Sequence, residues 1–137
     1  MKKIIFSIIA TIVFSASIQA QCKCGTTTTE SRWDGIGFRI SDGELKKYNC
    51  GYQFSVKTTD VVKFASGGYL CIGDASTCKA TYSGSLYRGT VRQRLITPFN
   101  FTNEVIQFTT PGSYRLVLEA SCNKTKCNQC VYYFTVR

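Results

Sequence analysis

The stretch that decides the fold is residues 114–122, which read YRLVLEASC. Apolar or small residues alternate there with polar ones. One face carries Tyr114, Leu116, Leu118, Ala120 and Cys122, and the other carries Arg115, Glu119 and Ser121. Successive side chains of a strand point to opposite sides, so this period of two predicts a strand with one buried face. Residues 52–57 and 130–137 repeat the alternation and are predicted as two more strands of this kind.

Further short strands are expected between these three. We predict them at residues 37–40, 61–64, 69–72, 79–83, 90–96, 99–102 and 105–108. Turn-forming residues separate them at 41–43, 66–68, 83–85, 97–98 and 111–112. Many short strands at a spacing of roughly 8–12 residues indicate an antiparallel sandwich. The sequence therefore predicts an all-β, immunoglobulin-like antiparallel β-sandwich stabilised by disulfides over residues 32–137.

The first 20 residues have the features of a secretory signal peptide. Two lysines at 2 and 3 precede an apolar run at 4–14, and small residues then lead to Ala20. The run is too short to span a bilayer, so we expect cleavage after Ala20, export, and no integral membrane span. Lipidation at Cys22 is the alternative, but Gln21 before it is neither small nor apolar. Residues 21–31, with four consecutive threonines, are predicted as a flexible N-terminal arm.

Eight cysteines in an exported chain indicate a disulfide framework. They are Cys22, Cys24, Cys50, Cys71, Cys78, Cys122, Cys127 and Cys130. A local bond between Cys71 and Cys78 is expected, and a further pair among Cys122, Cys127 and Cys130, or between one of these and Cys50. If residues 52–56 and 114–122 run in the same direction, as strands B and F do, Cys50 and Cys122 lie about 17–20 Å apart. That distance is beyond disulfide reach.

The same cysteines raise the alternative of a metal site. Cys127-x-x-Cys130 together with Cys22-x-Cys24 has a spacing that permits a four-thiolate zinc centre. We expect structural disulfides instead, because export favours oxidised sulfur. A redox-active pair would need a helix N-terminus after the first cysteine, whereas a strand is predicted to follow.

The acidic residues show no pattern typical of a catalytic or calcium site. Acids at predicted loop ends lack the Asp-x-Asp-x-Asp spacing of a calcium site; they are Asp34, Asp42, Glu44, Asp60 and Asp74. Glu104 and Glu119 would form a hydrolytic pair only if the fold brought them together. The sequence contains no histidine, which excludes Ser-His-Asp and Cys-His catalysis. We therefore predict that the protein is not an enzyme and has no cofactor, no metal and no catalytic residue.

Basic residues outnumber acidic ones, with 17 Lys and Arg against 8 Asp and Glu. Arg88, Arg92 and Arg94 form the densest basic segment, and we predict that Arg92 and Arg94 share one strand face. With exposed tyrosines beside them, they would suit an acidic polysaccharide or another polyanion. The candidate tyrosines are Tyr48, Tyr69, Tyr82 and Tyr87. A solvated strand face that discourages edge pairing is the simpler interpretation. Nucleic acid is not expected, because the chain is predicted to be exported and has no recognised nucleic-acid-binding motif.

Residues 111–114, Pro-Gly-Ser-Tyr, form a turn followed by the start of the deciding strand. In immunoglobulin-like sandwiches a Tyr near the start of strand F hydrogen-bonds back to the backbone at this corner. Tyr114 precedes Cys122 by eight residues rather than two. It is therefore either an analogous corner tyrosine or an ordinary core residue.

Several motifs occur in the order found in one group of bacterial modules. They are Trp33, Asn49-Cys50-Gly51, Cys71 with Cys78, residues 98–102 (PFNFT), residues 111–114 (PGSY), Cys122, and Cys127-Asn128-Gln129-Cys130 before a final strand. In these motifs the chain resembles the cysteine-rich immunoglobulin-like or PKD-like repeats of secreted and surface proteins of Bacteroidetes. The resemblance implies a sandwich fold and an exported interaction or structural module.

The sequence thus favours a secreted, disulfide-stapled, non-enzymatic module for adhesion, interaction or structure. Its expected partner is a protein or a surface glycan, and neither the partner nor the oligomeric state is identified. A carbohydrate- or polyanion-binding module that uses the segment Arg88–Arg94 is the second hypothesis. A third is a secreted enzyme or an enzyme inhibitor, and an inhibitor would act through a rigid exposed loop such as Cys71–Cys78 or Cys122–Cys130.

Overall fold

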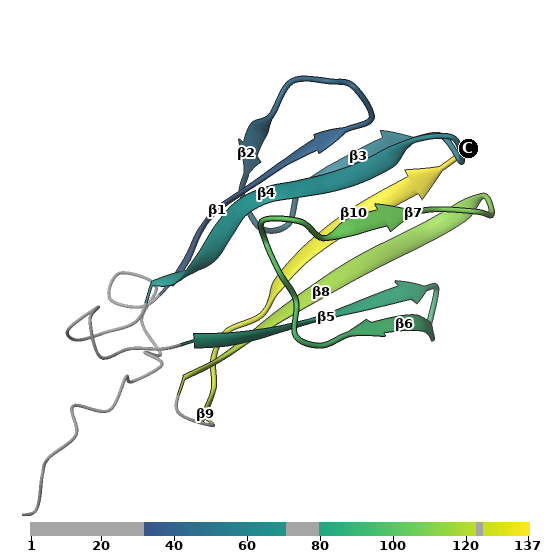
Figure 1. Cartoon of the computed structure of the whole chain (residues 1–137). Helices are drawn as coiled ribbons and strands as arrows, with labels where there is room; N and C mark the ends of the chain where they lie inside the picture. The colour runs from purple at the N-terminus through teal and green to yellow at the C-terminus, as the bar shows by residue number, and fades with distance from the viewer. Residues whose placement is uncertain (1–31, 71–79, 123–124) are drawn as a thin grey trace, which may run out of the picture.

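The computed structural model describes residues 32–70, 80–122 and 125–137, which form two β-sheets packed face to face (Figure 1). The smaller sheet has the order β2-β1-β4-β7. Its strands are β1 (Arg32–Ile40), β2 (Lys46–Tyr48), β4 (Val61–Leu70) and β7 (Val105–Gln107). The predictions for residues 1–31, for Cys71 and Cys78, and for Asp74 lie outside the described residues.

The larger sheet has the order β3-β10-β8-β5-β6, and β9 pairs with β8. Its strands are β3 (Gln53–Val56), β5 (Ala80–Arg88), β6 (Val91–Ile96), β8 (Gly112–Cys122), β9 (Thr125–Lys126) and β10 (Cys130–Val136). The order β6-β5-β8-β10 corresponds to strands C′, C, F and G of an immunoglobulin-like sandwich, and β1-β4-β7 corresponds to A, B and E. The predicted fold class is confirmed: the molecule is an all-β, immunoglobulin-like β-sandwich.

The expectation that residues 52–56 run in the same direction as residues 114–122 is wrong. Strand β3 is parallel to β10, and β10 is antiparallel to β8, so β3 and β8 run in opposite directions. Strand β4 occupies the position of strand B, while β3 is a short edge strand of the other sheet. The alternation identified the strand correctly, but alternation does not specify which neighbour a strand takes.

The core between the sheets is built largely from aromatic rings. Phe38 of β1 is completely buried and lies at its centre. Its ring centroid is 4.6 Å from that of Tyr48, 5.2 Å from Phe54, 5.1 Å from Phe64 and 5.4 Å from Tyr132. These residues come from both sheets. The ring contacts therefore hold the layers together, each adding about 0.5–1.5 kcal/mol beyond the apolar area it buries.

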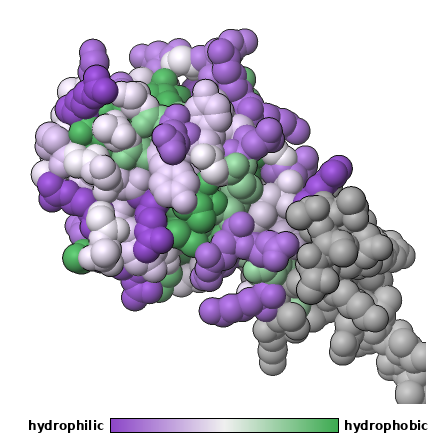
Figure 2. Space-filling model, turned by 180° about the vertical axis from the view of Figure 1, so that it is seen from behind, coloured by the Kyte–Doolittle hydropathy of each residue, from purple (hydrophilic) through white to green (hydrophobic). Residues whose placement is uncertain are grey.

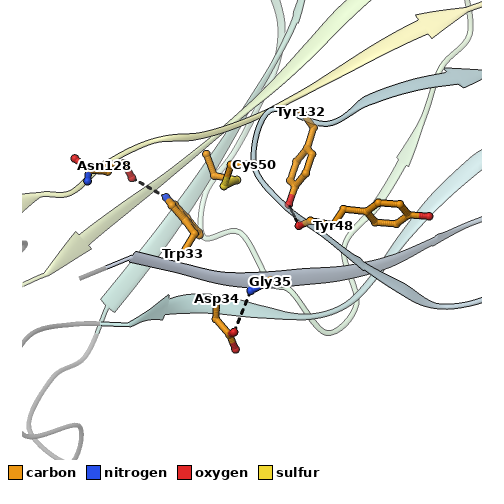
Figure 3. Close-up of a disulfide and its surroundings, with 8 residues drawn as sticks. Trp33, Asp34, Gly35, Tyr48, Cys50, Asn128 and Tyr132 are labelled. Atoms are coloured by element: carbon orange, nitrogen blue, oxygen red, sulfur yellow. Dashed lines mark hydrogen bonds between the residues drawn. A yellow bond between two sulfur atoms is a disulfide. The ribbon is translucent and has the colours of Figure 1, made fainter. Parts of the chain in front are cut away.

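Two hydrogen bonds near the Cys50–Cys130 disulfide tie the small sheet to the C-terminal part of the chain (Figure 3). The hydroxyl of buried Tyr132 on β10 donates to the carbonyl of Tyr48 on β2 over 2.8 Å. The indole Nε1 of Trp33 donates to the carbonyl of Asn128, also over 2.8 Å. Both bonds connect a strand of the small sheet with the C-terminal part of the chain.

The hydroxyl of Tyr114 donates to the carbonyl of Thr110, four residues earlier, over 2.8 Å. Tyr114 lies near the start of β8, the strand in the position of F, and is buried. Of the two roles that the sequence left open, Tyr114 therefore has that of a corner tyrosine.

Two of the predicted turns are wrong, because their glycines lie within strands. Residues 66–68 belong to β4, where the pairing with β1 shifts register and Gly67 has a φ of 153°. Residues 83–85 belong to β5, where a Cβ on Gly84 would lie 2.6 Å from Cδ2 of Phe99. One glycine therefore marks a bulge and the other a close contact, which are the two usual reasons for glycine inside a strand.

The strand predicted at residues 99–102 is also wrong, since this segment is a connection between β6 and β7. Phe99 and Phe101 are buried there, and Phe99 N donates to the carbonyl of Tyr82. Their apolar character reflects a loop anchored in the core rather than a strand. The strand predicted at 61–64 and the described part of the one predicted at 69–72, residues 69 and 70, form one strand in the structure, β4.

Candidate functional site

The structure joins Cys50 to Cys130, one of the pairings that the sequence left open. Cys50 precedes β3 and Cys130 begins β10, so the bond links two neighbouring parallel strands of the large sheet. Cys127 is disulfide-bonded as well. Disulfide sulfurs are not thiolates, so Cys127 and Cys130 are not available as zinc ligands in this oxidised state.

Cys122 lies at the same end of the large sheet and is fully buried. Its Sγ is 3.4 Å from the Sγ of Cys127. Burial raises the pKa of the Cys122 thiol, which disfavours the reactive thiolate. The cysteines at this end are thus part of the packing. Among the described residues, no three His, Cys, Asp or Glu side chains are placed to hold a metal ion.

Three of the acids named as calcium candidates make local contacts: Asp34, Asp60, and Glu44, which pairs with Lys46 over 3.5 Å. Asp60 accepts hydrogen bonds from the backbone N–H of Lys57 over 2.8 Å and from Ser41 Oγ over 3.0 Å. The first of these bonds contributes most to lowering the pKa of Asp60. Asp34 accepts from the N–H of Gly35, so both carboxylates stabilise turns or strand ends.

Glu104 and Glu119 do not form a carboxylate pair. Glu104 precedes β7 of the small sheet and pairs with Arg94 over 3.3 Å. Glu119 lies on β8 of the large sheet and accepts a hydrogen bond from Gln129 over 2.8 Å. Each carboxylate has its own partner, and the two carboxylates belong to different sheets, which does not favour the two-carboxylate chemistry of glycoside hydrolysis.

The prediction that Arg92 and Arg94 share one face is wrong. In the pairing of β5 with β6, Leu86 lies opposite Arg94 and Tyr87 lies opposite Arg92, so Gln93 is the extra residue of a bulge. Residues directly opposite each other project to the same side of a sheet. Arg94 therefore lies on the core side with buried Leu86, and Arg92 lies on the outer side with Tyr87.

The three arginines of the basic segment consequently have different surroundings. Arg94 reaches across the open edge between the sheets to Glu104 and to the carbonyl of Val105. The Nη2 of Arg88 donates to the carbonyl of Pro111 over 2.8 Å. Arg92 is exposed on the outer face. The structure does not bring Arg88, Arg92 and Arg94 together into one polyanion site.

A different set of residues comes together on the outer face of the large sheet. Tyr133 of β10 lies opposite Arg115 of β8, Arg115 lies opposite Tyr87 of β5, and Tyr87 lies opposite Arg92 of β6. We call these four residues the tyrosine–arginine row. The guanidinium carbon of Arg115 is 4.5 Å from the centroid of the Tyr87 ring, within the range of a cation–π contact.

The tyrosine–arginine row is accessible to a partner. Tyr133 is 44% exposed, and Arg92 and Arg115 are exposed as well. The next row of the same face is Val131, Val117, Ser85 and Leu95, of which Leu95 is 50% exposed. An apolar strip thus runs beside the row. The two rows contain no acidic residue, so the positive charge of the arginines is not neutralised within them.

The four tyrosines named from the sequence also have different surroundings. Tyr69 is buried, and Tyr82 uses its hydroxyl to accept a hydrogen bond from the Tyr69 N–H. Tyr48 packs against Phe38. Of these four, Tyr87 alone belongs to the tyrosine–arginine row. Arg115 and Tyr133 were missed because their positions, on two other strands, become neighbours only through sheet register.

Figure 2 shows the molecule from behind, where hydrophilic side chains surround a limited hydrophobic area. The described residues include no helix that is long and apolar enough to cross a membrane.

None of the family models, curated proteins or solved structures compared with this chain matches it.

Proposed function

We propose that this chain is an exported, non-enzymatic interaction module that binds a partner protein through the outer face of its large sheet. The observation that carries the proposal is the tyrosine–arginine row, which crosses four adjacent strands. Tyr and Arg are enriched among the residues that contribute most to protein–protein binding energy. They also lie on strands rather than on loops, so the surface is held rigid before binding.

The neighbouring apolar strip supports the same function. Leu95 and Val131 extend the contact area beside the row, while Val117 and Ser85 between them are buried. A rigid aromatic and apolar centre with charged groups at its side is the usual composition of a protein interface. Tyr133, Arg115 and Arg92 are exposed, so the row itself is open to a partner.

Export is supported by the basic and apolar start of the sequence and by its disulfides. Disulfides persist in oxidising environments such as the cell exterior or the periplasm. Asp34, Asp60 and Glu104 make local contacts, and the sequence lacks histidine, which supports a non-enzymatic role.

Binding of an acidic glycan is the second candidate, and one observation favours it. Arg92 and Arg115 lie on either side of Tyr87, in register on the same face. A carboxylate or sulfate group would bind the guanidinium groups, and the apolar face of a sugar would stack on the ring of Tyr87. This site replaces the basic segment Arg88–Arg94 with residues of three different strands.

The test compares two pairs of substitutions that change the net charge equally. The chain without residues 1–20 is expressed by secretion into an oxidising compartment, so that its disulfides form. It is then applied to intact cells of the organism that encodes it and to immobilised acidic and neutral polysaccharides. Arg92→Glu with Arg115→Glu alters the tyrosine–arginine row, and Lys46→Glu with Lys47→Glu alters the exposed strand β2. We expect at least a tenfold loss of binding from the first pair only.

Both candidates use Tyr87 and the arginines, so a third variant, Tyr87→Ala with Tyr133→Ala, should weaken the binding of either partner. Ionic strength distinguishes the two candidates. Binding of a protein partner should depend little on salt, whereas an acidic glycan should dissociate as the ionic strength rises. Equal losses from the β2 variant and the row variants, or no binding by the wild type to any of these surfaces, would refute the proposal.

A further inference from the structure

The outer face of the small sheet carries a second feature, on the opposite side of the sandwich from the tyrosine–arginine row. A depression of about 320 Å³ lies over β1, β4 and β7. Its volume is at the lower end of the range found for small-molecule sites. Arg39, Lys63, Leu45, Val105, Thr102 and Asn103 are among the residues that line it.

The positive charge in this depression has no acidic counterpart. Arg39 of β1 and Lys63 of β4 are direct cross-strand partners, and neither makes an ion pair with an acid of the described chain. Like charges placed directly opposite each other on a sheet are destabilising. A bound anion would relieve this repulsion by contacting both groups.

The walls of the depression are apolar, although they face solvent. Leu45 is 53% exposed and Val105 is 43% exposed, and both are among the most exposed large apolar side chains that the structure describes. Val105 lies opposite Lys63 on β7, so an apolar wall stands directly beside the charge. A ligand that carried charge alone would leave these two side chains in water.

The floor of the depression is formed by β4, where Ala65 contributes only a methyl group. At Gly37 of the neighbouring strand β1, the hydroxyl of Ser66 takes the place that a Cβ would occupy, and Cδ1 of Leu45 lies 3.8 Å from that place. Leu45 therefore stands at the side of the depression.

We propose that this depression binds a small amphiphilic carboxylate, with its head group on Arg39 and Lys63 and its alkyl chain between Leu45 and Val105. The charged pair selects the anion, and Arg39 offers a fork of N–H donors that suits a carboxylate. The exposed apolar walls select the chain, because burying them removes apolar surface from water. The site is separate from the tyrosine–arginine row and does not depend on the proposed function.

The experiment titrates the disulfide-intact chain with octanoate below its micelle concentration, followed by NMR and calorimetry. Two probes separate the contributions: n-octanol has the chain without the charge, and acetate has the charge without the chain. We expect saturable binding of octanoate, with shifts confined to signals of β1, β4 and β7. Octanol and acetate should each bind at least tenfold more weakly.

The matched variants are Arg39→Gln and Lys63→Gln in the depression and Arg115→Gln on the opposite sheet, each of which removes one positive charge. The first two should weaken octanoate binding at least fivefold, and Arg115→Gln should leave it unchanged. Absence of saturable binding, equal binding of octanol, or an equal effect of all three variants overturns the proposal. Near-UV circular dichroism verifies that each variant keeps the wild-type fold. None of these results bears on binding by the tyrosine–arginine row, which is measured with a different ligand.

Discussion

Replacing Tyr132 by Phe removes one hydroxyl from the core and leaves the ring in place. That hydroxyl donates to the carbonyl of Tyr48 over 2.8 Å and links the two sheets between residues 84 positions apart. Tyr132 is fully buried, so water cannot replace the lost donor. Removing one partner of a buried hydrogen bond costs about 1–3 kcal/mol. We expect the free energy of unfolding to fall by about 2 kcal/mol.

The assay is equilibrium unfolding in urea without added oxidant or reductant, so that the disulfides stay intact. The emission of Trp33 reports the unfolding, since its indole donates to Asn128 in the folded state. A loss of about 2 kcal/mol should lower the denaturation midpoint with no change of slope, because the exposed surface is unaltered. In thermal unfolding the same loss corresponds to roughly 8 °C for a domain of this size.

Tyr133→Phe is the matched control, because it makes the same chemical change at the next residue of the same strand. Tyr133 is 44% exposed, so its hydroxyl is accessible to water. The control should change stability by less than about 0.5 kcal/mol. A Tyr132→Phe variant as stable as this control would refute the view that the bond to Tyr48 holds the sheets together.

Three further predictions concern the same scaffold. Tyr114→Phe removes the corner bond to Thr110 and should lower the unfolding free energy by about 1–2 kcal/mol, again measured in urea against Tyr133→Phe. Replacing Cys50 and Cys130 together by Ala opens a link between residues 80 positions apart and should cost about 2–4 kcal/mol, a result contradicted by a loss in thermal stability below about 4 °C. Burial raises the pKa of Tyr132 above its ordinary value of about 10, so the unfolded chain loses this proton at a lower pH than the folded one. Stability should therefore fall as pH rises above 10, by up to about 1.4 kcal/mol per pH unit, and Tyr132→Phe should lack this part of the slope when unfolding is measured at pH 9, 10 and 11.

The sequence by itself determined the fold class and the buried faces of the strands. The alternation of residues 114–122 and 130–136 matches the inward side chains of β8 and β10, because a period of two is a local property of an extended backbone. The glycines and other turn-forming residues were less informative about where the strands end. Gly67 and Gly84 resemble turn residues in sequence, but in the structure one lies at a bulge and the other makes room for Phe99.

Only the tertiary structure decided which strands became neighbours, and with them both candidate sites. Strand β3 pairs with β10 from the far end of the chain, which also places Cys50 beside Cys130. A single extra residue, Gln93, sends Arg92 and Arg94 to opposite faces. Pairing between distant strands depends on the packing of the whole core, and a shift of one residue exchanges the two faces of a strand. The tyrosine–arginine row and the cationic depression are products of that register, and for this reason neither is visible in the sequence.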